Sequence, residues 1–277
     1  MRLSIITPSF RNSKWLKLCI ASVADQGVEL EHIVQDSCSD DGTQDWLPHD
    51  TRVKAFIEKD AGMYDAVNRG LRRATGEICA YLNCDEQYLP GALSAVLGFF
   101  DRNSGIEVVF ADAVVNDPQG RYLCHRKAML PGKYHTWISA NLAILTCATF
   151  FRRKILDKHG LFFDPKLKVV GDGEWVMRLI DQRVAMGILR RFTSTFTETG
   201  DNMSARPIAL RERSELIASA PAWARGFRSL FIGHYRLRKL LAGAYGRKPF
   251  RYEIYAETSP FVRIPFEVPH PTTRWRR

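Results

Sequence analysis

The sequence of 277 residues lacks the short motifs that identify several large enzyme classes. It has no G-x-x-x-x-G-K-S/T loop for a nucleoside triphosphate, and no G-x-G-x-x-G after the first expected strand for a dinucleotide. It also has no G-x-S-x-G turn for a nucleophilic serine and no H-E-x-x-H pair for zinc. Kinase-like phosphoryl transfer, hydride transfer and serine hydrolysis therefore have no support in the sequence.

Long apolar runs and closely paired cysteines are also missing. The longest mostly apolar stretch, residues 138–151, is shorter than the roughly 20 residues that a membrane-spanning helix requires. The first apolar run ends at Thr7 and Pro8, too early for a secretion signal. The six cysteines form no C-x-x-C pair, so we expect reduced and mostly buried thiols. Together these features predict a cytoplasmic protein.

Acidic residues are scarce in the C-terminal part, which carries almost all of the net charge of +10. Residues 201–277 contain 15 Lys and Arg against 6 Asp and Glu, whereas residues 1–200 contain 25 against 24. Anionic partners are therefore expected to contact the C-terminal part. A basic nucleic-acid-binding protein is a less favoured alternative, because no recognised nucleic-acid-binding motif accompanies these charges. We expect no nucleic-acid partner.

Within this basic part, residues 223–241 predict an amphipathic helix. Its bulky apolar residues are Trp223, Phe227, Leu230, Phe231, Tyr235, Leu237, Leu240 and Leu241. Its basic residues are Arg225, Arg228, Arg236, Arg238 and Lys239. Such a helix can lie in an anionic membrane interface, which would place the protein at the inner face of the membrane. The alternative is that the helix packs on the rest of the chain or on a second subunit, so the oligomeric state, including a homodimer, stays open.

Residues 1–111 alternate short apolar runs with segments of helical periodicity. The runs at residues 3–7, 32–35, 53–57, 78–82 and 106–111 predict strands, and the segments that follow Asn12, Gly62 and Pro90 predict helices. This order predicts an α/β fold, a mostly parallel sheet with helices on both faces. Beyond residue 111 we expect short helices at 152–159 and 175–180, a strand at 184–189, and basic helices at 207–220 and 223–241.

Polar residues follow four of the expected strand segments: Thr7, Asp36, Asp60 and Asp85. In parallel sheets, ligands bind beyond the carboxyl ends of the strands. Carboxylates without nearby Cys or His ligands suit Mg²⁺ or Mn²⁺, which usually also contact substrate phosphates. The sequence therefore predicts an acidic ligand site at this edge of the sheet.

Several blocks of the sequence resemble the inverting family 2 glycosyltransferases, which have the GT-A fold. The blocks are SIITPSFRN at 4–12, QDSCSDDGT at 35–43, EKDAGMYDAVNRG at 58–70, ATGE at 74–77, YLNCDE at 81–86, ATFFRR at 148–153 and GDGEW at 171–175. The resemblance covers about residues 2–204. It implies a Rossmann-like GT-A catalytic domain at 1–204, with a nucleotide-sugar-binding half at 1–111 and an acceptor-side half at 112–204. A basic helical extension at 205–277 would follow it.

The resemblance also implies a reaction. One sugar would pass from a UDP- or GDP-sugar donor to an acceptor hydroxyl with inversion, in the synthesis of a cell-surface polysaccharide or glycolipid. The acceptor would be a saccharide or a lipid-linked saccharide. The Q-x-x-R-W element of polymer-forming relatives is absent, which favours the addition of a single sugar. A family member that binds nucleotide without catalysis is the alternative.

The matching blocks assign the donor-binding and metal-binding residues. The donor nucleotide is expected at Thr7, Pro8, Asp36, Asp60, Gly62, Asn83 and Asp85. The family's metal-binding D-x-D element corresponds to Asn83-Cys84-Asp85, with Asn83 in place of the first acid. The resemblance therefore implies Mn²⁺ or Mg²⁺ at Asp85 and Glu86. Asp36 could instead cap a turn.

The block at 171–175 supplies the expected catalytic base. Inverting transfer needs a general base that takes the proton from the acceptor hydroxyl. The resemblance assigns this role to Asp172, with Glu174 as the alternative if Asp172 is only a helix cap.

Overall fold

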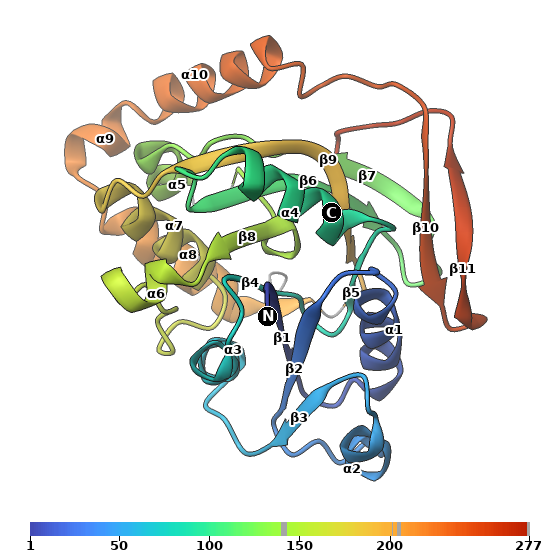
Figure 1. Cartoon of the computed structure of the whole chain (residues 1–277). Helices are drawn as coiled ribbons and strands as arrows, with labels where there is room; N and C mark the ends of the chain where they lie inside the picture. The colour runs from blue at the N-terminus through green and yellow to red at the C-terminus, as the bar shows by residue number, and fades with distance from the viewer. Residues whose placement is uncertain (140–142, 201, 204–205, 276–277) are drawn as a thin grey trace.

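The protein is described by a computed structural model that covers residues 1–139, 143–200, 202–203 and 206–275 (Figure 1). Its strands are β1 (Leu3–Ser9), β2 (Leu30–Asp36), β3 (Lys54–Ile57), β4 (Ile78–Tyr81), β5 (Glu86–Tyr88), β6 (Val108–Asn116), β7 (Tyr122–Arg126), β8 (Thr149–Arg152), β9 (Met186–Thr197), β10 (Phe250–Ala256) and β11 (Ser259–Val268). Its helices are α1 (Ser13–Ala24), α2 (Thr43–Trp46), α3 (Met63–Arg73), α4 (Ala92–Arg102), α5 (Lys133–Ser139), α6 (Lys154–His159), α7 (Gly171–Asp181), α8 (Pro207–Ala218), α9 (Ala222–Gly226) and α10 (Arg228–Leu241), with 3₁₀ turns η1 (Leu47–His49) and η2 (Thr146–Ala148).

A mixed sheet organises the described part of the chain, with nine strands in the order β3-β2-β1-β4-β8-β6-β9-β5 and β7 paired to β6. β1 pairs in parallel with β2 and β4, and β2 pairs in parallel with β3. The predicted α/β fold is confirmed. Strands β1 to β4 form a parallel half, as the alternation of strands and helices in the sequence predicted. The second half adds antiparallel pairs of β8 with β4 and β6, of β5 with β9, and of β7 with β6.

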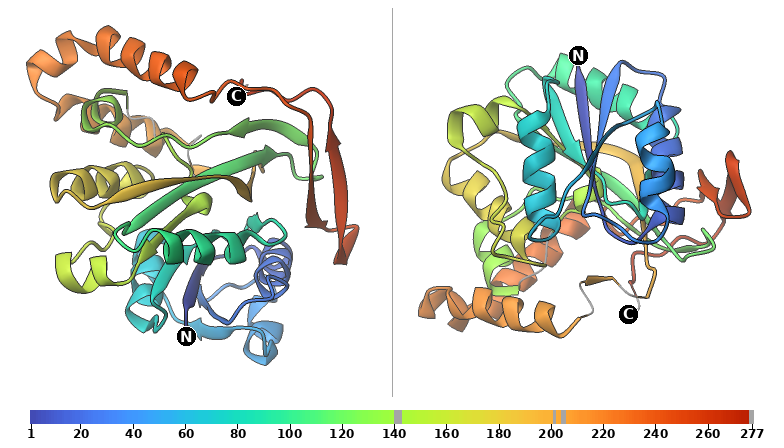
Figure 2. Two further views of the ribbon diagram at one scale, coloured as in Figure 1. Left: turned by 45° about the horizontal axis from the view of Figure 1, so that its top comes forward. Right: turned by 90° about the horizontal axis from the view of Figure 1, so that it is seen from below.

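The alternation of side chains along β1 divides the core into two layers. Leu3 and Ile5 pack in the cluster that includes residues of α1 and α4, whereas Ile6 packs in the cluster that includes residues of α3. Successive strand residues point to opposite faces, so a short apolar run is enough to fill both layers. Figure 2 shows α1 and α3 on opposite faces of the parallel half.

Several element boundaries differ from the sequence-based expectations. The helix expected at 175–180 begins earlier, at Gly171, so that Asp172 and Glu174 lie in its first turn. The strand expected at 184–189 extends as β9 to Thr197, because its second half pairs with both β6 and β5. The single helix expected at 223–241 is divided into α9 and α10 at Phe227. Among the described residues, no helix combines the length and the apolar character needed to cross a bilayer.

The chain ends in a hairpin, β10–β11, that the sequence analysis did not anticipate. The hairpin packs along α1, at whose end Asp25 forms an ion pair with Arg263 (2.6 Å). It also contacts β5, because the Gln87 side chain forms hydrogen bonds with the backbone of Tyr255 (2.8 and 2.9 Å). Figure 1 shows it on the side of the molecule away from α9. The boundary expected between residues 204 and 205 lies outside the described residues.

The buried carboxylate of Glu31 joins the strands of the parallel half. Its Oε1 accepts hydrogen bonds from the Ser4 hydroxyl (2.6 Å) and from the Thr75 backbone N–H (2.6 Å), and Oε2 pairs with Lys54 (2.6 Å). Burial alone would raise the pKa of Glu31, but these donors together lower it from 4.5 to about 2. Glu31 thereby fixes the start of β4, the strand that leads to residues 83–86.

We expect Glu31→Gln to lower the free energy of unfolding at pH 7 by about 1.5–3 kcal/mol, the typical contribution of hydrogen bonds to a charged group. Because the folded-state pKa is depressed, this contribution is present above about pH 4.5 and is lost as the pH falls towards 2. Denaturant unfolding from pH 7 to pH 2 measures the difference between the two proteins. Glu29→Gln, at an exposed acid nearby, is the control. If the difference in free energy of unfolding between the wild type and Glu31→Gln stayed constant from pH 7 to pH 2, the ionised Glu31 carboxylate would not be the source of the stabilisation.

Candidate active site

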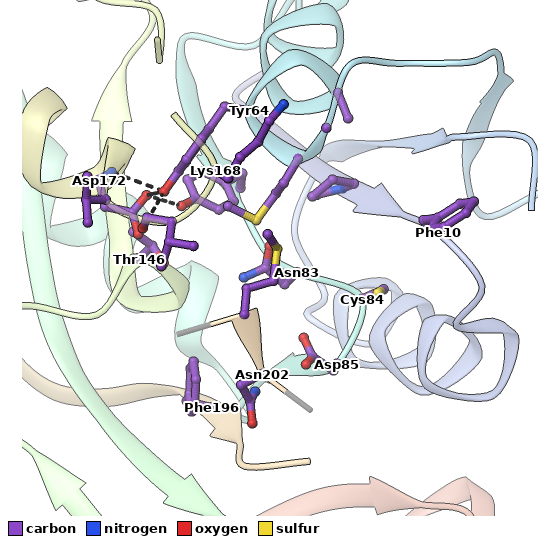
Figure 3. A pocket seen from close by; sticks show the side chains of 18 of the residues that line it. Phe10, Tyr64, Asn83, Cys84, Asp85, Thr146, Lys168, Asp172, Phe196 and Asn202 are labelled. Atoms are coloured by element: carbon purple, nitrogen blue, oxygen red, sulfur yellow. Dashed lines mark hydrogen bonds between the residues drawn. The ribbon is translucent and has the colours of Figure 1, made fainter. Parts of the chain in front are cut away.

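A cavity of about 1400 Å³ lies at the carboxyl ends of the parallel strands (Figure 3). Its lining comes from the loops after β1, β3 and β4, from the start of α7, and from α5, α8 and the end of β9. Six residues expected at the site line it: Pro8, Asp60, Gly62, Asn83, Asp85 and Asp172. Among the described residues, the lining does not include four others that were expected there: Thr7, Asp36, Glu86 and Glu174.

The carboxylate of Asp172 is held by two tyrosines from other elements of the fold. The hydroxyl of Tyr81, at the end of β4, donates to Oδ1 at 2.6 Å, and the hydroxyl of Tyr64, in α3, donates to the same atom at 3.0 Å. The backbone N–H of Asp172 also donates to the Tyr64 hydroxyl at 3.2 Å. Figure 3 shows Tyr64 and Asp172 at one wall of the cavity. The two hydroxyls fix one carboxylate oxygen of Asp172 in place.

Burial raises the pKa of Asp172 from 3.8 to about 6, because the ionised carboxylate loses its hydration. The hydrogen bonds from Tyr81 and Tyr64 act in the opposite direction and limit the rise. A carboxylate with a pKa near 6 is ionised at neutral pH and is also a better proton acceptor than an ordinary aspartate. This combination is typical of a general base.

Glu174, unlike Asp172, is not among the described residues that line the cavity, and its carboxylate has a different partner. Its two carboxylate oxygens bind Arg178, one turn further along α7, at 2.6 and 2.8 Å. The residue that caps the start of α7 is Val170, without a side-chain cap bond. Asp172 therefore does not serve as the cap, and of the two acids only Asp172 is among the described residues that line the cavity.

The loop before α7 is held by Glu212 from α8, a residue that the sequence analysis did not single out. Its buried carboxylate accepts the backbone N–H groups of Lys168 (2.8 Å), Val169 (2.8 Å) and Val170 (3.0 Å). Three donors that precede a helix would otherwise lack partners. A residue beyond position 204 therefore shapes the loop that presents Asp172.

The loop after β4 presents one carboxylate to the cavity and buries the next. Burial raises the pKa of Asp85, which lines the cavity, to about 6. Glu86 lies behind it; burial and then the charge of Asp85 raise its pKa well above 4.5. Oε2 of Glu86 accepts the backbone N–H of Asn83 at 2.8 Å, whereas Oε1 has no hydrogen-bond partner in the described structure.

These two adjacent carboxylates fit a divalent cation, because a positive charge would offset the burial that disfavours their ionisation. No group of three metal-ligating side chains occurs in the part of the chain that the structure describes. Mg²⁺ and Mn²⁺ often rely on one or two carboxylates together with substrate phosphates and water, so Asp85 on the cavity wall meets the requirement.

The remaining residues expected at the donor site divide into lining and supporting positions. The Asp36 carboxylate accepts the N–H (2.8 Å) and hydroxyl (2.7 Å) of Ser39, so it caps the turn after β2, as the alternative had it. The Thr7 hydroxyl lies in the core against Nε2 of His32 at 2.8 Å. Asp60 does line the cavity, and its Oδ1 accepts the N–H of Gly62 at 2.8 Å, which orders that loop.

Cationic side chains on the cavity wall were not identified from the sequence. They are Arg11, Lys59, Arg126, Lys168, Arg206 and Arg213. They come from five separate segments, with Arg206 and Arg213 both at α8, so no local motif in the sequence predicts them. Such a wall suits an anionic ligand.

The family model for glycosyl transferase family 2 matches residues 4–160, more than half of the chain. The chain belongs to glycosyl transferase family 2. A Campylobacter jejuni GalNAc(5)-diNAcBac-PP-undecaprenol beta-1,3-glucosyltransferase is 33% identical over 121 residues, 41% of this chain and 38% of that protein. A Mycobacterium bovis PGL/p-HBAD biosynthesis glycosyltransferase is 29% identical over 126 residues, 43% of this chain and 49% of that protein. The matched part thus spans less than half of these relatives.

Solved structures show that this family 2 member has the expected GT-A fold. Staphylococcus aureus TarS 1–349 in complex with UDP-GlcNAc aligns with a TM-score of 0.62 at 18% identity, over 87% of this chain and 73% of that one. The mannosyltransferase PcManGT from Pyrobaculum calidifontis, in complex with GDP-Man and Mn²⁺, aligns with a TM-score of 0.55 at 16% identity, over 87% and 78% of the two chains. At these identities the likeness concerns the fold alone.

We expect Asp172→Asn to stabilise the ligand-free family 2 protein at neutral pH. Because the folded-state pKa of Asp172 is raised, its contribution to stability is full below about pH 3.8 and is lost as the pH rises through 6. The Asn variant does not titrate, so its advantage in free energy of unfolding should grow to about 3 kcal/mol by pH 8. Denaturant unfolding between pH 4 and pH 8 measures this. Asp181→Asn, at an exposed acid of the same helix, should show no such growth; equal pH profiles for all three proteins would refute the burial argument.

Proposed function

We propose that this family 2 protein is an inverting glycosyltransferase that moves one sugar from a UDP- or GDP-sugar to an acceptor hydroxyl. The observation that carries the proposal is the placement of Asp172, a buried carboxylate with a pKa of about 6, in the same cavity as Asp85. The two groups have different environments: hydroxyl donors surround Asp172, whereas Asp85 adjoins a second carboxylate. This difference suits two separate roles in one displacement reaction.

The donor nucleotide would bind along the loops that follow β1, β3 and β4. Pro8, Asp60 and Gly62 line this side of the cavity, together with Asn83 and Asp85. The left-handed backbone of Gly62 (φ +128°) lets this loop turn close to a ligand. Asp36 and Thr7 would support these loops from behind, through Ser39 and His32.

Asp85 would hold Mn²⁺ or Mg²⁺, with Glu86 as the buried carboxylate beside it. When bound, such an ion neutralises the charge that develops on the departing nucleoside diphosphate. The complex of PcManGT with GDP-Man and Mn²⁺ supports a metal-dependent reaction. Lys168, whose Nζ binds the carbonyl of Ala61 beside Gly62, adds positive charge to the same wall.

Asp172 would act as the general base on the acceptor side. It takes the proton of the acceptor hydroxyl as that oxygen forms its bond to the anomeric carbon, while the bond from this carbon to the diphosphate oxygen breaks. Attack from the face opposite the leaving group inverts the configuration. The tyrosine hydroxyls on Oδ1 leave the second carboxylate oxygen for the acceptor proton.

The acceptor would be a saccharide or a lipid-linked saccharide of a cell-surface glycan. The name of the Campylobacter relative specifies a saccharide on undecaprenol through PP, which supports an acceptor of this class. The wall formed by α5 and α8, which we assign to the acceptor side, offers the cationic group of Arg213 for it.

We expect Asp172→Asn to lower turnover about 10²–10⁴-fold, because the amide cannot accept the proton. Release of UDP or GDP from a nucleotide sugar, with water as acceptor, measures turnover before the natural acceptor is known. Glu174→Gln is the matched control on the same helix and should retain most of the activity. Wild-type activity should fall as the pH drops below about 6, where Asp172 becomes protonated. An inactive Glu174→Gln with an active Asp172→Asn would reverse the assignment.

We expect Asp85→Ala to remove the metal-dependent part of nucleotide binding. Thermal shift with a panel of UDP- and GDP-sugars first identifies the donor, because a ligand that binds the folded state raises the unfolding temperature. Calorimetric titration of that nucleotide with and without Mn²⁺ then gives the increment due to metal. In the wild type and in the surface control Asp101→Asn, Mn²⁺ should increase the affinity for the nucleotide by about tenfold or more. The same increment in Asp85→Ala would show that Asp85 does not hold the ion.

A further inference from the structure

The outward side of α9 and α10 carries a row of exposed apolar side chains. Phe227, Leu230, Leu237, Leu240 and Leu241 are exposed by 57, 66, 53, 63 and 79%. At 3.6 residues per turn they occupy one sector of α10 about 140° wide. Trp223 extends this row onto α9: its ring contacts Tyr134 of α5 (4.8 Å between centroids), but the residue is still 52% exposed. We call these six residues the apolar row.

The opposite side of the two helices packs on α5. The ring of Phe231 lies 5.3 Å from that of Tyr134, and the ring of Tyr235 stacks on His135 at 3.7 Å. This corrects the expectation that all eight bulky residues share one free face, because Phe231 and Tyr235 belong to the packed side. The packing holds α10 in place with the apolar row exposed. Figure 1 shows α10 at the edge of the molecule.

The segment around the apolar row has only one sign of charge. Residues 216–252 contain no Asp or Glu and eight basic residues, namely Arg225, Arg228, Arg236, Arg238, Lys239, Arg247, Lys248 and Arg251. By the same periodicity, Arg236 and Arg238 of α10 lie on the two flanks of the row. A two-fold contact between copies through this face would oppose like charges. Nucleic acid is also a poor occupant, because the exposed bulk is mostly leucine rather than stacking rings.

We propose that the apolar row and its flanking arginines bind the interface of an anionic lipid bilayer. Leucine and tryptophan side chains enter the boundary of the acyl chains, while the basic side chains contact the anionic headgroups. Exposed bulky apolar side chains flanked by basic residues are typical of a helix that lies in a membrane interface.

The same geometry connects the lipid-facing surface to the cavity. Helix α5 contacts α9 and α10 through Tyr134 and His135, and its next residue, Thr136, lines the cavity. Arg213 and Leu216 of α8 line the neighbouring wall. A bilayer bound to α9 and α10 therefore lies one helix away from the acceptor-side wall. Lipid binding itself requires no substrate, so it is tested separately from the transfer reaction.

Co-sedimentation with vesicles tests the proposal on the full chain. One set of vesicles contains phosphatidylcholine alone, and the other contains phosphatidylcholine with about one third phosphatidylglycerol. We expect binding to the anionic vesicles at low salt, at least about tenfold weaker binding to the neutral vesicles, and weakening by added NaCl. The double variant Leu230→Glu/Leu241→Glu should lose at least about tenfold in affinity, since it places acids in the row.

The matched control is Phe261→Glu at the tip of the β10–β11 hairpin, where the side chain is 90% exposed and apolar but lies away from the row. It should bind anionic vesicles like the wild type. Thermal unfolding checks that the variants fold, which is expected because all substituted side chains are exposed. Absence of wild-type binding, equal binding of the double variant, or equal loss in Phe261→Glu would each overturn the proposal. So would a dimer, seen by light scattering, that the double variant abolishes while vesicle binding is absent.

Discussion

The arrangement of the site depends on one buried carboxylate, Asp172, and on the contacts that hold it. Its tyrosine donors come from α3 and from the end of β4, so the parallel half of the sheet must be in register for them to meet. Tyr64 is in turn stacked on Phe163 (5.5 Å between centroids). At position 171 a side chain is excluded, because a Cβ there would lie 2.6 Å from the Tyr64 ring. The glycine before Asp172 thus permits the close approach of Tyr64 that holds the Asp172 carboxylate in the cavity wall.

The cavity concentrates groups that the folded chain would avoid if stability were the only requirement. Burial raises the pKa of Asp85, Glu86 and Asp172 together, and each rise records an ionised state that is less favourable than in water. Stability and activity therefore oppose each other at these positions. Glu31 shows the contrary case: it is buried as well, but its donors more than compensate, and it strengthens the fold rather than the site.

The sequence predicted those features that depend on short segments. Pro8, Asp60, Gly62, Asn83 and Asp85 lie at or just beyond the ends of strands whose pattern was clear, and parallel order brings such ends to one edge. The sequence did not predict contacts between segments that are far apart in the chain. Glu212 binds a loop more than forty residues earlier, and the β10–β11 hairpin packs on α1. Asp36 has a local partner instead, because Ser39 lies three residues on and donates a hydrogen bond to each of its carboxylate oxygens.

The basic residues of the C-terminal part matter for the site because α10 packs on α5, and both α5 and α8 line the cavity. The nearly neutral first 200 residues carry the acidic groups of the cavity, whereas the basic surplus lies beyond them. Had the basic residues been spread evenly, an anionic surface would attract every face of the protein equally. The segment 216–252 carries eight of these basic residues and no Asp or Glu, so it attracts an anionic surface at short range, within about one Debye length, roughly 10 Å. In the proposed membrane-bound state, the surface of α9 and α10 that contacts the bilayer is separated from the cavity by one helix, α5.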